Sequence, residues 1–140
     1  MPSSRGAGVR ARLAVGVNAG VVLALGLALL VPLTLSLLYR DGSWQSFLIP
    51  AAFMIPLGAA GLWVSRLKGI GYVLERDVYL SVTLAWVLVA FLGGIPYILE
   101  GTFTSLLDST FEGMSGFTTT GATLLAEIEA ETPSILFCAA

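Results

Sequence analysis

The sequence has no histidine and a single cysteine among its 140 residues. Without histidine, the chain lacks both the commonest general base and the commonest metal ligand. The lone Cys138 cannot form a disulfide within the chain and belongs to no metal-binding spacing. We therefore expect neither an enzyme nor a structural metal site, and we expect no cofactor.

Charged residues are also scarce. Only 11% of the residues are charged, whereas 56% are hydrophobic and the mean hydropathy is +0.90. Soluble domains carry roughly a quarter of their residues as Asp, Glu, Lys and Arg. A chain with so few charged residues cannot form the polar surface that a protein folded in water needs. We therefore expect it to fold in a lipid bilayer. Nothing in this composition favours a nucleic-acid partner.

Three long stretches of the chain contain no charged residue. They cover residues 13–39, 42–65 and 78–99, and are 27, 24 and 22 residues long. About 20 apolar residues cross the hydrocarbon core as a helix. A cleavable signal peptide is the rival interpretation of the first stretch, but its apolar region would span only about 7–15 residues. The sequence therefore predicts an all-α integral membrane protein with three transmembrane helices.

The basic residues predict the orientation of these helices, because Lys and Arg stay preferentially on the cytoplasmic side. With a cytoplasmic amino terminus, six of the seven basic residues lie inside and only Arg40 lies outside. The acidic residues from Glu100 onward then lie on or near the outer face, where they would attract cations. For Glu127, Glu129 and Glu131, a merely solvated loop is an equally good interpretation.

The segment after Gly101 differs from the three stretches. Residues 105–116 fit a helix of about 18 Å, too short to cross a membrane. Asp108 and Glu112 are four residues apart and are expected on one face of this helix. The run at 118–123 is rich in threonine and contains Gly121, which opposes helix continuation. We expect a re-entrant loop, which is tolerated at membrane depth only inside protein or along a water-filled cavity.

A hydroxyl-rich strand with glycine suits potassium, whose hydration shell must be replaced by oxygen atoms. Glycine permits the dihedral angles that turn carbonyl groups toward an ion. The preceding short helix would direct the negative end of its dipole toward the cation. Threonine-rich runs also occur in ordinary loops, so the spacing alone leaves a purely structural loop as the alternative.

The stretch at residues 108–125 reads DSTFEGMSGFTTTGATLL and resembles the first pore helix and filter of Trk/Ktr potassium transporters. The family pattern there is approximately D-x-x-F-E-x-M-S-G-[LF]-T-T-T-G-A-[TS]. The resemblance extends over nearly the whole chain from about Leu13. It implies two leading helices within residues 13–66, after a cytoplasmic segment 1–12. The first of four helix–pore loop–helix repeats would begin at residue 76 and run to 140.

The resemblance also implies roles for individual residues. Gly121 would be the filter glycine, Thr119 and Thr120 would offer oxygens to potassium, and Thr118 and Ala122 would flank them. Asp108 and Glu112 would be acids of the pore helix. No metal other than potassium is implied.

For the complete protein, the resemblance implies a multi-pass protein of the bacterial inner membrane. It further implies a homodimer and a cytosolic nucleotide-binding regulatory subunit. The chain stops at Ala140, where the inner helix of the first repeat would only begin. We therefore expect an amino-terminal fragment that does not conduct potassium alone. The alternative is a small helical membrane protein with a structural or assembly role.

Overall fold

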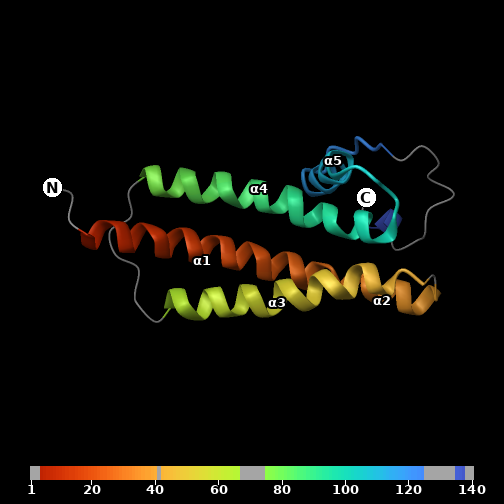
Figure 1. Ribbon diagram of the computed structural model, residues 1–140, viewed down its shortest axis with the longest axis horizontal. Helices are drawn as coiled ribbons and strands as arrows, with labels where there is room; N and C mark the ends of the chain where they lie inside the picture. The colour runs from red at the N-terminus through yellow and green to blue at the C-terminus, as the bar shows by residue number, and fades with distance from the viewer. Residues whose placement is uncertain (1–3, 41, 67–74, 125–134, 138–140) are drawn as a thin grey trace.

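The computed structural model describes residues 4–40, 42–66, 75–124 and 135–137, and within these ranges the chain forms helices and no strands (Figure 1). The helices are α1 (Ser4–Ala28), α2 (Leu30–Tyr39), α3 (Trp44–Arg66), α4 (Glu75–Glu100) and α5 (Leu106–Phe117). Residues 135–137 are helical as well, where a further helix was expected to begin. Asp41, Lys68, Glu127, Glu129, Glu131 and Cys138 lie outside the described residues.

Among the described residues, three helical stretches are long and apolar enough to cross a membrane: Ala14–Tyr39, Trp44–Ser65 and Glu75–Glu100. They correspond to the three uncharged stretches at 13–39, 42–65 and 78–99, so three candidate membrane-spanning helices are found where the sequence predicted them. The first span consists of α1 and α2, with a turn at Leu29 between them. Pro32 explains this break, because it has no N–H for the carbonyl of Ala28 and its ring crowds that carbonyl.

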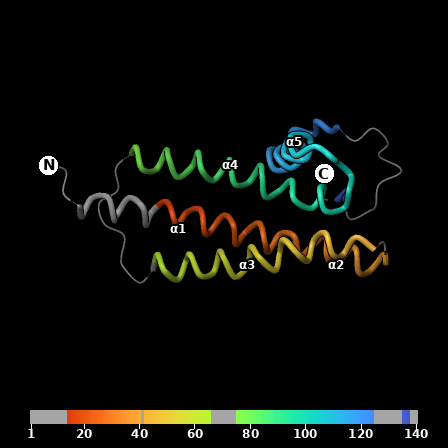
Figure 2. The backbone as a smooth tube through the Cα atoms, viewed as in Figure 1, coloured from red at the N-terminus to blue at the C-terminus, as the bar shows by residue number. Residues whose placement is uncertain are grey.

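The three spans lie side by side with α1 between α3 and α4 (Figures 1 and 2). Glycine allows α1 and α3 to approach closely. A Cβ atom added at Gly58 would lie 2.6 Å from the backbone N of Leu23, and one at Gly61 would lie 2.6 Å from the Cβ of Ala19. In a lipid bilayer the hydrophobic effect does not drive helices together, so their association depends on the close packing that small residues allow. The buried apolar core comprises Val22, Leu25, Leu29, Phe47, Ala51, Met54, Tyr97 and Ile135.

Helix α5 crosses the second half of α4 steeply, since Figure 1 shows α5 almost along its axis while α4 lies across the view. The crossing point is a contact between glycines. A Cβ atom at Gly113 would lie 2.7 Å from the backbone N of Gly94, and one at Gly94 would lie 2.7 Å from the carbonyl O of Ser109. Gly93 precedes the end of α4 by seven residues, or about 10 Å of helix. Helix α5 thus lies against the apolar part of the third span.

Candidate functional site

The residues predicted from the sequence to bind potassium lie together in a non-helical segment after α5, residues 118–124, here named the Thr–Gly segment. The chain leaves the helix abruptly. The N–H of Thr119 donates to the carbonyl of Gly116 at 3.2 Å, and that of Thr120 donates to the carbonyl of Ser115 at 3.1 Å. This pair of bonds is a Schellman motif, which ends a helix by placing one residue in the left-handed conformation.

Two residues of the Thr–Gly segment have positive φ: Thr119 at 52° and Gly121 at 68°. Gly121 adopts this conformation without steric cost. Thr119 does not, because a β-branched residue with positive φ is an outlier. Such conformations persist only where surrounding interactions enforce them, and they cluster at functional sites.

Oxygen atoms crowd the start of the Thr–Gly segment. The hydroxyls of Thr118 and Thr120 are hydrogen-bonded at 2.6 Å, and the hydroxyl of Thr119 donates to the carbonyl of Thr118 at 2.7 Å. All residues from 118 to 124 are exposed. They follow the carboxyl-terminal end of α5, where the helix dipole is negative and favours a cation. This end of the loop therefore combines accessible oxygens with a favourable field.

Glu112 connects α5 to the far end of the Thr–Gly segment. Its side chain is 1% exposed. One carboxylate oxygen accepts a hydrogen bond from the hydroxyl of Thr123 at 2.7 Å, and the other accepts one from the N–H of Leu124 at 2.9 Å. Burial of a carboxylate is costly unless its oxygens are hydrogen-bonded. Here each oxygen has a donor from the same segment.

The other predicted acid, Asp108, is exposed and does not join this contact. The buried face of α5 instead contains Ser109, Glu112, Gly113 and Ser115, which pack toward α4. From their spacing of four residues, both acids were expected on one face of α5, but Glu112 is buried and Asp108 is exposed. Only Glu112 reaches the Thr–Gly segment, because the crossing with α4 at Gly113 turns that face inward.

Two contacts between helices were not predicted from the sequence. The first is the crossing of Gly113 with Gly93 and Gly94, for which the Gly-Gly pair within a span was the available signal. In the second, the hydroxyls of Ser43 and Ser46 each donate to a carboxylate oxygen of Glu100 at 2.7 Å. This contact joins the end of α4 to the start of α3, whose positive dipole end favours the carboxylate.

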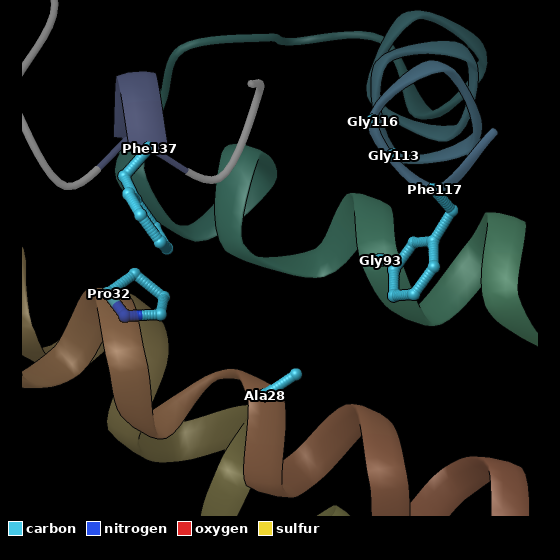
Figure 3. Close-up of a pocket in the computed structure, with 7 residues that line it drawn as sticks. All are labelled: Ala28, Pro32, Gly93, Gly113, Gly116, Phe117 and Phe137. Atoms are coloured by element: carbon cyan, nitrogen blue, oxygen red, sulfur yellow. The ribbon is translucent and has the colours of Figure 1, made fainter. Parts of the chain in front are cut away.

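An apolar cavity of about 220 Å³ separates α5 from the first span (Figure 3). In Figure 3, the ring of Phe117 points from the end of α5 toward Gly93, and Phe137 points toward Pro32. The remaining lining residues are Ala28, Gly113 and Gly116. Four of the seven lining residues are glycine or alanine, so the cavity arises where α5 and α4 lack side chains. In the part of the chain that the structure describes, no cluster of three or more Cys, Asp or Glu residues could hold a metal ion.

Comparison with known proteins shows related sequences. The chain is 32% identical over 118 residues to an uncharacterized cation transporter of Methanocaldococcus jannaschii, which is 84% of this chain and 24% of the relative. It is 33% identical over 110 residues to the Trk system potassium uptake protein TrkH of Escherichia coli, which is 78% of this chain and 23% of the relative. TrkG of the same organism is 27% identical over 103 residues, or 73% of this chain and 21% of the relative. The chain thus spans about a quarter of the length of these curated relatives. No protein-family model matches it.

Proposed function

We propose that this chain, which is similar in sequence to the Trk potassium uptake proteins, supplies the first pore loop and the first selectivity-filter strand of such a protein. In this proposal α5 is the pore helix and the Thr–Gly segment is the filter strand. The main observation in support is the backbone conformation of that segment. Thr119 and Gly121 have positive φ, and all residues of the segment are exposed.

Each residue has a part in the proposed filter. Backbone oxygens around Thr119 and Thr120 replace water around potassium, and their hydroxyls add further oxygen. Gly121 permits the left-handed turn between them and the rest of the strand. Thr118 and Ala122 flank the site. The negative end of the α5 dipole adds attraction for the cation.

The position of α5 along α4 supports a re-entrant loop. Helix α5 has 12 residues, about 18 Å of helix, and crosses α4 at Gly93 and Gly94. The crossing lies about 10 Å back from the end of α4, so the loop returns to the level of the apolar span. Such a loop needs neighbours that satisfy its backbone, or water. The rest of a complete transporter would supply them, and the 140 residues alone are not expected to conduct.

We further propose a bacterial inner-membrane location with a cytoplasmic amino terminus, as the basic residues predict. In the complete protein, partners are expected to be a second copy and a cytosolic nucleotide-binding regulatory subunit. Labelling of single cysteines in intact cells tests the orientation. In a Cys138→Ser background, Glu129→Cys is expected to react with an impermeant reagent added outside, and Ile70→Cys is expected to be protected. The reverse pattern would contradict the orientation.

Replacement of the matched segment in a complete relative tests the function. In this hybrid transporter, the present chain replaces the segment that it matches in TrkH of Escherichia coli. We expect the hybrid to restore growth at low potassium to cells that lack other potassium importers. A matched hybrid with Gly121→Asp should accumulate without restoring growth, because a carboxylate at a left-handed position beside the ion path distorts the site. Equal growth with both hybrids would favour a structural role for the segment.

A further inference from the structure

We infer that Glu112 is a positioning residue for the Thr–Gly segment: its buried carboxylate fixes the far end of the proposed filter strand through Thr123 and Leu124, and thereby sets ion selectivity. This inference rests on the proposed function, because selectivity has meaning only if the segment binds ions. The fixing itself is a property of the 140-residue chain.

The geometry shows why a carboxylate is needed at this position. Its two oxygens meet two donors, the hydroxyl of Thr123 at 2.7 Å and the N–H of Leu124 at 2.9 Å. Hydrogen bonds to a charged acceptor are the strong ones. A glutamine at the same place has only one oxygen, so it can accept only one of the two hydrogen bonds, and as a neutral acceptor it makes a weaker bond than the carboxylate. The Glu112 side chain is therefore matched to this pair of donors by its chemistry as well as by its length.

The Thr–Gly segment is fixed at both ends. At its start, the N–H groups of Thr119 and Thr120 are bonded to the last turn of α5. At its end, Thr123 and Leu124 are bonded to Glu112 in the middle of the same helix. Only Gly121 and Ala122 lie between the two attachments. The distance between the ends, and with it the spacing of oxygens along the strand, is thus set by α5.

Loss of the second attachment leaves the first intact. The Schellman bonds do not involve Glu112, so the helix end and the positive φ of Thr119 are expected to remain. The stretch from Gly121 onward would then move relative to α5. Oxygens whose spacing is no longer fixed can move closer together and coordinate a smaller ion such as sodium. We expect weaker discrimination of potassium from sodium, with α5 still formed.

Amide exchange in the 140-residue chain, reconstituted in lipid nanodiscs, tests the attachment. With Glu112→Gln, exchange at the N–H of Leu124 should accelerate roughly tenfold or more, the change expected when a hydrogen bond to a charged acceptor is lost or is replaced by one to a neutral acceptor. Amides inside α5 should not change. The matched control is Asp108→Asn, which removes the same charge from an exposed position of the same helix and should leave Leu124 unaffected. Unchanged exchange at Leu124, or a joint acceleration of Leu124 and α5, would overturn the inference.

Sodium inhibition of rubidium uptake by the hybrid transporter tests the consequence. Glu112→Gln and Thr123→Val should both make sodium a stronger inhibitor, whereas Thr123→Ser keeps the hydroxyl and should behave as the unchanged hybrid. The double variant should show no more than the larger single effect, because both changes break one contact. Faster exchange at Leu124 with unchanged inhibition overturns the selectivity role of Glu112.

A Gly121→Ser hybrid distinguishes the two levels of failure. If inhibition by sodium changes with Gly121→Ser but not with Glu112→Gln, only the inference about Glu112 fails. If it changes with neither, the segment is not the filter, and the proposed function fails with it.

Discussion

Gly113 and Gly121 lie eight residues apart, but glycine is required at the two positions for different physical reasons. A Cβ atom at Gly113 would lie 2.7 Å from backbone atoms of Gly93 and Gly94, whereas one at Gly121 would meet nothing within 4 Å. Gly121 instead has a φ of 68°. The first glycine is needed for space between two helices, and the second for a backbone conformation. If the proposed filter is right, substitutions at the two positions should therefore have separable effects: a change in stability at Gly113 and a change in ion selectivity at Gly121.

Removal of the Glu112 carboxylate, which joins α5 to the Thr–Gly segment, should have the largest effect on stability. In Glu112→Leu, the hydroxyl of Thr123 and the N–H of Leu124 lose their acceptor, and each lost hydrogen bond to a charged group costs about 1.5–3 kcal/mol. We expect the hybrid to accumulate poorly and to take up little rubidium. Thermal unfolding in detergent measures the loss. Normal accumulation with normal uptake would make Glu112 an incidental residue.

Crowding at the helix crossing should have the next largest effect. A Cβ atom in Gly113→Ala meets backbone of α4, which cannot move aside as a side chain does, so we expect a loss of about 1–3 kcal/mol. Gly20→Ala is the matched control, because its Cβ would meet only Leu62 Cδ2 at an ordinary 3.9 Å. Melting temperatures of the two variants give the comparison. An equal response would mean that α5 does not depend on this contact.

Release of backbone strain should give a smaller effect of opposite sign. Thr119 has positive φ, which costs a residue with a Cβ roughly 1–2 kcal/mol. Thr119→Gly should therefore stabilise the chain by about 1 kcal/mol, whereas Thr119→Ala should not, because alanine retains the Cβ. Thermal unfolding of the two variants decides. If Thr119→Gly destabilises the chain, the left-handed conformation is not strained by the side chain.

The sequence predicted the features that depend on local composition. The three spans followed from uncharged stretches, because hydrocarbon requires about 20 apolar residues for a crossing. The helix expected at 105–116 is observed at Leu106–Phe117. The unusual backbone at Gly121 was also expected, since a glycine after three threonines marks a conformation that other residues avoid.

The features that depend on distant neighbours were not predicted. The spacing of Asp108 and Glu112 treated the two acids alike, but the crossing with α4 buries one and leaves the other exposed. The positive φ of Thr119 opposes the preference of a β-branched residue, and the hydrogen bonds that end α5 impose it. The contact of Glu112 with Thr123 and Leu124 joins residues 11 and 12 positions apart, which no helical period relates.

The most direct test of the proposed filter is the selectivity of the hybrid transporter with Gly121→Ser. Competition of sodium against rubidium uptake, in cells lacking other potassium importers, gives the selectivity ratio at a measured level of protein. A Cβ at a left-handed position costs about 1–2 kcal/mol, so we predict a loss of discrimination of roughly fivefold or more while the helices remain inserted. Thr119→Ala and Thr120→Ala should do less, because their backbone carbonyls remain. An unchanged ratio in a well-expressed Gly121→Ser protein would contradict the account, because the glycine would then only turn a loop.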